Sequence, residues 1–162
     1  MKRMPNRLLA LDQSSRVTGF AVFEDGMLIK VGKFALEDSE FSVRLHKFKK
    51  KISQLIRDYE ITEVAFEEIQ LQQNVDTFKK LAMVYGLMLY TVEDHQLPYT
   101  IISSNTWKSK CGIKKSTREP EKKQAQQFVQ ERYGIKVTQD EADATCLGWT
   151  HCNTTKDFDW SN

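Results

Sequence analysis

The sequence predicts an α/β domain in which a mixed five-stranded sheet, three antiparallel strands and then parallel strands, is flanked by helices on both faces. Strand-rich segments at residues 7–11, 17–23 and 27–36 follow one another with short connections, as in an antiparallel meander. Two further strand segments alternate with helical ones, which is typical of parallel strands joined by right-handed crossovers. At 162 residues the chain is long enough for one buried core. We predict one domain over residues 1–152 and a loose tail over residues 153–162.

The composition matches that of an ordinary soluble globular protein. Hydrophobic residues make up 40% of the chain and charged residues 28%, which favours neither a disordered nor a membrane class. No apolar run approaches the roughly 20 residues that cross a bilayer, and the basic start lacks the apolar segment of a secretory signal. The three cysteines show no CxxC spacing, so neither a disulfide framework nor a cysteine zinc site is indicated. We expect a cytoplasmic protein without a membrane partner.

Each predicted element has a local signal. The second strand ends at Asp25-Gly26, a strong hairpin signal. From Phe41 to Ile56 apolar residues recur every three or four positions, as on one face of a helix, and the lysines at 47–51 fall largely off that face as a solvated surface. A short strand at residues 61–66, a long helix at 75–93 and a strand at 98–102 follow.

The C-terminal third is predicted to be helical. Residues 103–117 are polar and broken by Gly112, which indicates a short helical turn and then a mobile loop. Pro120 stands at an early position of the next helix, and a last helix covers residues 139–151.

Four carboxylates are expected to meet at one edge of this sheet. Asp12 ends the first strand and Glu67 the fourth, and parallel neighbouring strands bring such ends to the edge where α/β sheets bind ligands. Asp140 and Asp143 are three residues apart at the start of the last helix and share a face. Helix capping or turn formation is the alternative role for these residues. Glu68 replaces Glu67 if the strand register differs by one.

Carboxylates gathered at one point indicate a hard divalent cation. They repel one another, and their pKa values rise unless cations neutralise them. Mg²⁺ prefers oxygen ligands and shares them with water and substrate phosphate. Two such ions, about 3.5 to 4 Å apart, promote in-line displacement at phosphorus. The site therefore predicts metal-assisted phosphodiester hydrolysis.

Three segments carry a family resemblance. LLALDQSSRVTGFAVF and VAFEEIQ resemble the first two motifs of RuvC Holliday-junction resolvases, a family with the RNase H-like fold and with phage-type members, and DEADATCLGWTHC is similar to its last motif. The resemblance implies that Asp12, Glu67, Asp140 and Asp143 hold two Mg²⁺ or Mn²⁺ ions. It also implies an endonuclease that resolves four-way junctions by paired nicks, leaving 5′-phosphate and 3′-hydroxyl ends.

The resemblance extends to the DNA-contacting region and to a homodimer. WKSKCGIKKSTREPEKKQAQQFV resembles the family's DNA-contacting segment, with Lys108 and Lys122 at matching positions. The dimer contact is expected on the helix at residues 75–93, with Met83, Tyr85 and Met88 either on that surface or in the core. The residues predicted to bind branched DNA are Gln70, Lys108, Lys110, Lys114, Lys115, Lys122 and Lys123.

The sequence departs from the family pattern in ways that keep a second function open. Ser14 stands where many members have glycine, and Gln70 stands where an aromatic wedge is frequent. Gln70 cannot stack on a base as an aromatic ring does. The alternative is therefore an RNase H-like nuclease of broader specificity, acting on forks, flaps, three-way junctions or RNA–DNA hybrids. A junction-binding protein without nuclease activity would need the lysines but not the four acids. His151 either assists water activation or is a surface histidine.

Overall fold

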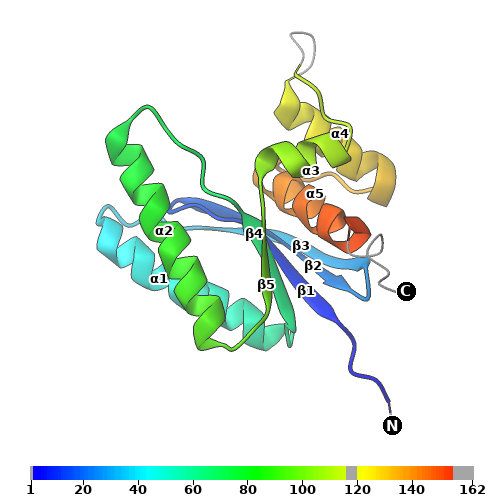
Figure 1. The fold of residues 1–162 in the computed structure, drawn as a ribbon, viewed down its shortest axis with the longest axis horizontal. Helices are drawn as coiled ribbons and strands as arrows, with labels where there is room; N and C mark the ends of the chain where they lie inside the picture. Colours follow the sequence, from blue (N-terminus) through cyan, green and yellow to red (C-terminus); the bar gives the residue numbers. More distant parts are fainter. Residues whose placement is uncertain (1, 116–119, 155–162) are drawn as a thin grey trace, which may run out of the picture.

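The computed structural model describes residues 2–115 and 120–154 (Figure 1). Its centre is a five-stranded sheet in the order β3-β2-β1-β4-β5. β2 is antiparallel to both β1 and β3, whereas β4 is parallel to β1 and β5 is parallel to β4. The predicted mixed sheet is therefore confirmed. The strands are β1 (Arg7–Asp12), β2 (Val17–Glu24), β3 (Met27–Ala35), β4 (Glu63–Glu67) and β5 (Tyr99–Ile102).

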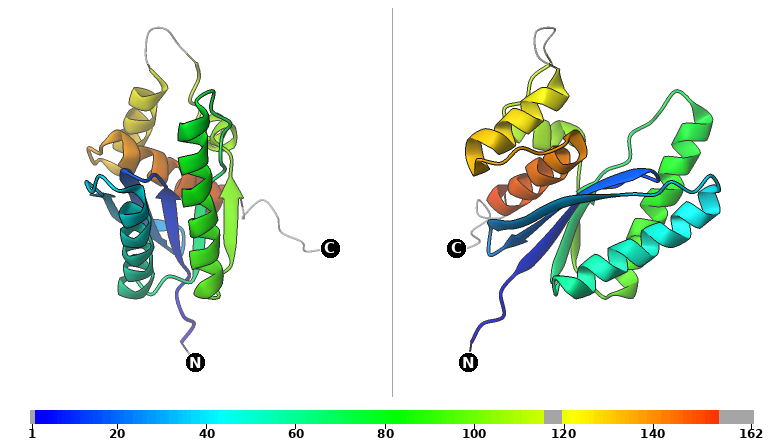
Figure 2. Two further views of the ribbon diagram at one scale, coloured as in Figure 1. Left: turned by 90° about the vertical axis from the view of Figure 1, so that its left-hand side faces the viewer. Right: turned by 180° about the vertical axis from the view of Figure 1, so that it is seen from behind.

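Helices cover both faces of the sheet, as predicted (Figures 1 and 2). Two long helices pack on one face, and three helices from the C-terminal third pack on the other. None of the helices within the described residues combines the length and apolar composition needed to cross a bilayer. The helices are α1 (Phe41–Asp58), α2 (Val75–Asp94), α3 (Ser104–Lys110), α4 (Glu121–Tyr133) and α5 (Gln139–Thr154).

The alternation of side chains along β1 divides the core into two clusters. Leu9 and Leu11 point towards α1 and α2, where they pack with residues such as Phe48. Leu8 and Ala10 point the other way, towards α3, α4 and α5. β1 is buried on both faces because it lies at the centre of the sheet, which explains its continuous apolar sequence. Asp12, two residues after Ala10, shares the α5 face.

The predicted boundaries hold with small differences. Asp25 and Gly26 both have positive φ, 47° and 85°, as the predicted tight hairpin requires. The last helix continues to Thr154, and side chains of its final residues bond carbonyls one turn back, including Thr154 Oγ1 to the Thr150 carbonyl at 2.7 Å. Asn153 and Thr154 are therefore helical rather than part of a tail. The rest of the predicted tail, residues 155–162, and part of the predicted mobile loop, residues 116–119, lie outside the described residues.

Candidate active site

Asp12 and Glu67 lie next to each other at the ends of neighbouring parallel strands. The register pairs Leu11 of β1 with Phe66 of β4, so the following residues of each strand are adjacent, with backbones about 4.8 Å apart. Ala10 and Ala65, two residues earlier on each strand, both belong to the cluster beneath α5. Because strand side chains alternate with a period of two, both carboxylates point to the α5 face of the sheet.

The start of α5 brings the other two acids to this edge. Gly19 of β2 pairs with Asp12, and a Cβ at Gly19 would collide with the backbone carbonyl of Asp140. The helix backbone therefore rests directly on the strand beside Asp12, and Asp140 and Asp143, three residues apart, follow one face of α5. The structure thus brings together the four predicted carboxylates from β1, β4 and α5.

Capping does not account for Asp140 and Asp143, because other residues cap α5. The Thr138 backbone N–H donates to Glu141 Oε1 at 2.9 Å, and the Glu141 N–H donates to Thr138 Oγ1 at 3.4 Å. This reciprocal pair is a capping box. Glu141 thus makes the capping hydrogen bonds at the helix start, and Asp140 and Asp143 take no part in them.

The acids of this cluster strongly influence one another. Burial, followed by the charges of Glu67, Asp143 and Asp140, raises the pKa of Asp12 well above its usual value. Burial and the Glu67 charge raise the pKa of Asp143 to about 7. Burial also raises the pKa of Glu67, against the opposing effect of a hydrogen bond from Trp107. Carboxylates in this state are stabilised by a nearby cation.

The donor set fits a hard divalent cation. Among the described residues, no group of three or more His, Cys, Asp or Glu side chains is spaced to hold a metal ion as it stands. Mg²⁺, however, usually keeps several waters and takes only one or two carboxylates together with substrate phosphates. Four carboxylates gathered at one sheet edge, with the pKa values of Asp12, Glu67 and Asp143 raised, therefore suit an ion that water and phosphate help to hold.

Glu67, not Glu68, faces Asp12. Glu68 accepts a hydrogen bond from the Ile69 N–H at 2.9 Å. On the α2 side, burial and a hydrogen bond to Glu68 raise the pKa of Tyr85. The two adjacent glutamates thus point to opposite faces, and the strand register agrees with the predicted assignment.

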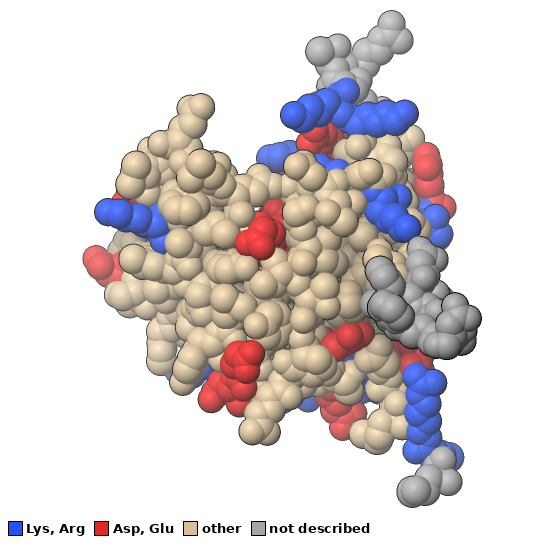
Figure 3. All heavy atoms as spheres, viewed as in Figure 1, with Lys and Arg blue, Asp and Glu red and all other residues tan. Residues whose placement is uncertain are grey.

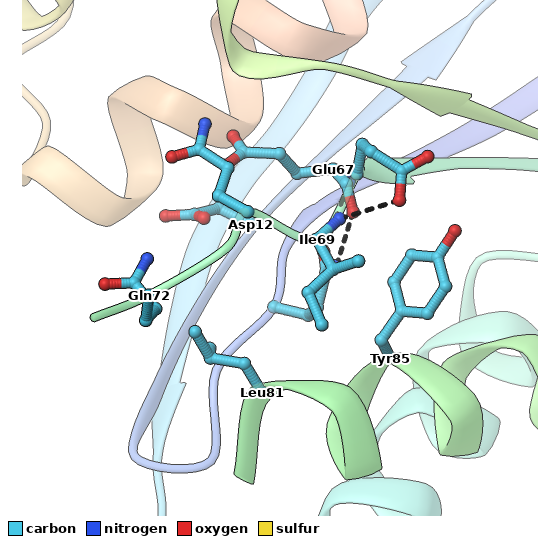
Figure 4. A pocket seen from close by; sticks show the side chains of 9 residues that line it. Asp12, Glu67, Ile69, Gln72, Leu81 and Tyr85 are labelled. Atoms are coloured by element: carbon cyan, nitrogen blue, oxygen red, sulfur yellow. Dashed lines mark hydrogen bonds between the residues drawn. The ribbon is translucent and has the colours of Figure 1, made fainter. Parts of the chain in front are cut away.

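A pocket opens beside the acids, between the end of β4 and α2. It has a volume of about 200 Å³ and is lined by residues including Asp12, Glu67, Gln72, Leu81 and Tyr85. Figure 4 shows the two acids on one side of the pocket and the two α2 residues on the other. This pocket gives Asp12 and Glu67 access to solvent.

Two of the predicted DNA-binding lysines lie close enough to lower the pKa values of the acids. Lys108 of α3 lowers the pKa of Glu67 and Asp143, and Lys122 of α4 lowers that of Asp12 and Asp143. Lys108 Nζ also lies 2.9 Å from Glu121 Oε2, which joins α3 to α4. Lysine and arginine side chains gather at this end of the molecule in Figure 3.

The other predicted lysines lie farther along the same region. Lys114 and Lys115 line a shallow cavity of about 240 Å³ together with Glu121. Lys110 ends α3, and Lys123 lies in the first turn of α4. All four are exposed.

Gln70 is tied to the protein rather than projecting freely. Its Nε2 donates a hydrogen bond to Ser104 Oγ at the start of α3, and Ser104 is buried. The next residue, Leu71, is 86% exposed. This loop therefore presents an exposed aliphatic side chain beside the site.

The packing corrects the prediction for His151 and decides between the two alternatives for Met88. His151 is buried and lies 3.3 Å from Glu63 Oε2 at the start of β4, four residues and about 13 Å from Glu67. It is neither a surface residue nor a neighbour of Asp12. The helix α5 runs across the sheet from the strand ends that carry Asp12 and Glu67 to the opposite ends of the strands, and His151 lies near that second end. Met88 is fully buried under α2 and belongs to the core, whereas Met83 is exposed and Tyr85 lines the pocket.

Sequence reasoning missed three residues that shape the site. Gln13 bonds the backbone of Glu67, Trp107 bonds its carboxylate, and Gly19 admits α5. Gln13 directly follows Asp12 and Trp107 precedes Lys108, so both stood beside predicted site residues. No local pattern distinguished them, because their partners are distant in the sequence.

Comparison with known proteins agrees with this geometry. A family model described as "Crossover junction endodeoxyribonuclease RuvC" matches residues 8–151. The RuvC of Francisella tularensis subsp. holarctica is 29% identical over 92% of this chain and 89% of its own length. The Methylococcus capsulatus RuvC is 28% identical over 57% of this chain and 58% of that protein.

A solved structure shows the same fold. The structure described as "T. thermophilus RuvC in complex with Holliday junction substrate" has a TM-score of 0.77 and 14% sequence identity, and the match covers 94% of this chain and 96% of that one. The family model covers most of the chain and all four carboxylates. The chain belongs to the RuvC family of crossover junction endodeoxyribonucleases.

Proposed function

We propose that this protein resolves four-way DNA junctions by cutting two strands at sites formed by Asp12, Glu67, Asp140 and Asp143. The observation that carries the proposal is the convergence of these acids from β1, β4 and α5 at one sheet edge, within a chain of this family. The lysines of α3 and α4 beside the acids support a phosphate-bearing substrate.

Hydrolysis at this site would use Mg²⁺ or Mn²⁺, with two ions held by the four carboxylates. When bound, such ions lower the pKa of a water and stabilise charge on the attacking and leaving oxygens of a phosphodiester. The protein supplies the fixed positions: Asp12 and Glu67 on rigid strand ends, and Asp140 and Asp143 on a helix that rests on β2. The products would carry 5′-phosphate and 3′-hydroxyl ends.

DNA would be held mainly through its phosphates. Lys108 and Lys122 lie at the edge of the acidic cluster, and Lys110, Lys114, Lys115 and Lys123 extend the basic surface along α3 and α4. Lysine contacts to phosphate add affinity without reading sequence, and that affinity falls with salt.

Paired cutting requires two copies, and we propose a homodimer built on α2. Val75, Met83 and Tyr90 of this helix are exposed apolar side chains, and their spacing places them along one stripe. A two-fold dimer presents two identical sites to a two-fold junction. The proposal also includes a cytoplasmic location, since all three cysteines are free thiols.

Broader specificity is the second candidate, and the Gln70 contact favours it. Because Gln70 is bonded to Ser104, it offers no stacking surface to an opened base pair. Under this alternative, forks, flaps, three-way junctions or RNA–DNA hybrids are cut at rates near those for four-way junctions.

A substrate panel with an inactive variant tests both candidates. Asp12→Asn should abolish cleavage of labelled four-way junctions in Mg²⁺ because it removes a central carboxylate, while binding measured in Ca²⁺ remains. The control is Asp38→Asn, which changes an acid bonded to Lys47 on another surface and should leave the rate unchanged.

Two results would contradict the proposal. Normal cleavage by Asp12→Asn would remove the acids from the reaction. Equal cutting of four-way junctions, forks, flaps and hybrids by the wild type would favour the second candidate.

A further inference from the structure

We propose that Gln13 and Trp107 are positioning residues that together hold Glu67 opposite Asp12. This pair is called the Glu67 clamp below. Gln13 acts on the backbone of Glu67 and Trp107 on its carboxylate. The inference rests on the proposed function, because it concerns the geometry of the same acidic site.

Gln13 extends the pairing of β1 and β4 beyond the last paired residues. That pairing ends with Leu11 and Phe66. The Gln13 side chain then donates from Nε2 to the Glu67 carbonyl at 2.7 Å and accepts at Oε1 from the Glu67 N–H at 3.2 Å. The Gln13 side chain thus makes the two hydrogen bonds that a backbone segment would make in a longer strand pair. These bonds hold together the ends of β1 and β4, where Asp12 and Glu67 lie.

Trp107 orients the carboxylate itself. Its indole Nε1–H donates to Glu67 Oε2 at 2.9 Å. The ring is 1% exposed and packs in the cluster that contains Ala65 and Ile102. The indole N–H therefore has a fixed position, and the hydrogen bond forms only when the Glu67 carboxylate lies in one orientation. The indole has no acceptor, and its hydrogen bond occupies one carboxylate oxygen while Oε1 is available to a cation.

The clamp opposes forces that would otherwise turn Glu67 away. The charge of Glu67 raises the pKa of both Asp12 and Asp143, so the acids repel one another. The charge of Lys108 attracts Glu67 as well. A free glutamate side chain would rotate away from the other acids, and a misplacement of about 1 Å is enough to cost a site about 100-fold in rate. A neutral donor fixes the carboxylate without cancelling the charge that attracts a cation.

Trp107→Phe tests the carboxylate half of the clamp, because it keeps an aromatic ring and removes the N–H. We expect Mn²⁺ affinity, measured by electron paramagnetic resonance titration without DNA, to fall about 10- to 100-fold, the usual cost of losing a group that orients a metal ligand. Single-turnover cleavage should fall to a similar extent, while junction binding in Ca²⁺ stays unchanged. Trp149→Phe is the matched control, since Trp149 packs on Phe128 and Arg132 away from the acids.

Gln13→Met tests the backbone half and covers the case in which Trp107→Phe does not fold. Methionine has a similar length but cannot make the two hydrogen bonds. We expect weaker Mn²⁺ binding here too, with junction binding retained. Gln126→Met is the control, because Gln126 Nε2 also donates to a backbone carbonyl, that of Val137 at 2.9 Å, but on α4.

The outcomes separate the clamp from the proposed function. If wild type and both clamp variants bind Mn²⁺ equally and cut at equal rates, the clamp is overturned while the nuclease assignment stands. If Trp149→Phe and Gln126→Met lose Mn²⁺ affinity to the same extent as the clamp variants, the effect is general destabilisation and the clamp is again overturned. If the wild type binds no Mn²⁺ and cuts nothing, the proposed function itself fails.

Discussion

Asp143 shows how the acidic site sets its own pH dependence. Its pKa is raised to about 7 by burial and by the Glu67 charge. A carboxyl group with a raised pKa lends the fold stability only while it is protonated. That contribution is complete below the ordinary value of 3.8 and is lost as the pH rises through about 7. Asp12 and Glu67, whose pKa values are also raised, act in the same direction.

We therefore predict that the metal-free protein has a lower melting temperature at pH 8 than at pH 5.5, and that Mg²⁺ raises it more at pH 8. Thermal unfolding in EDTA and in Mg²⁺ at the two pH values measures this. The pKa values of Asp38 and Glu63 are lowered, so these two groups affect stability only at pH values below the range from 5.5 to 8. Asp143→Asn should flatten the pH dependence, and a higher melting temperature at pH 8 in EDTA would contradict the prediction.

Leu71 is the residue for which we predict an effect on substrate choice. It is 86% exposed on the loop that leaves Glu67, while its neighbour Gln70 is held by Ser104. Aliphatic side chains at DNA-binding sites insert between base steps that are already weakly stacked. Leu71→Ala should therefore reduce the ratio of four-way to linear duplex cleavage by about 10-fold, the equivalent of about 1.4 kcal/mol. Competition cleavage with two labelled substrates measures the ratio.

Met4→Ala is the control for Leu71. Met4 is also an exposed apolar residue, at 77%, but it precedes β1 and lies towards the opposite edge of the sheet. An unchanged ratio for Leu71→Ala, or an equal decrease for Met4→Ala, would exclude a specific contact by Leu71.

At the level of secondary structure elements, the placement of α5 decides whether a site exists. Gly19 lies under the Asp140 end of this helix, and Gly148 lies within the helix against Phe23 and Ala10. Both glycines permit close packing, but only Gly19 is next to Asp12. The two ends of one helix can therefore be disturbed separately.

We predict that Gly19→Ala lowers the cleavage rate by about 100-fold or more, because displacing Asp140 and Asp143 by about 1 Å has an effect of that size. Gly148→Ala should lower the melting temperature while reducing the cleavage rate far less. Cleavage is compared at a temperature well below both transitions, with folding checked by circular dichroism. Equal activity of the two variants would contradict this prediction, because it would mean that a displacement at either end of α5 moves the whole helix.

The elements were predictable from the sequence wherever a local pattern determined them. Strand-rich segments with short connections and the Asp25-Gly26 turn predicted the meander, and the ends of parallel strands predicted that Asp12 and Glu67 meet. The bonds of Gln13 and Trp107 to Glu67 join residues 54 and 40 positions apart, and no periodicity encodes such contacts. His151 was predicted wrongly, and Met88 was left open between the dimer surface and the core, because a helical pattern predicts an apolar face but not which part of the helix lies over which end of the sheet.

At the scale of the whole molecule, the α2 stripe of Val75, Met83 and Tyr90 governs the proposed dimer. We predict that Met83→Glu weakens the dimer by about 30-fold, the equivalent of about 2 kcal/mol for a buried interface residue, because it buries an unpaired charge. Analytical ultracentrifugation measures the dissociation constant, and cruciform plasmid cleavage distinguishes paired from single nicks. Single nicks should accumulate.

The control for the dimer is Met27→Glu. Met27 is 72% exposed at the β2–β3 hairpin, away from α2. It should leave the dimer and the paired cuts unchanged. A dimer that Met83→Glu does not weaken would place the contact elsewhere.

The order in which the four acids occur along the chain affects when the protein can become active. Asp12 and Glu67 belong to strands made early in synthesis, whereas Asp140 and Asp143 belong to α5, the last of the described helices. A growing chain that has not yet reached α5 carries half of the carboxylates and leaves one face of β1 and β2 uncovered. Under the proposed function, a chain acquires the complete set of acids only when α5 also completes the core, so cutting activity would not precede folding.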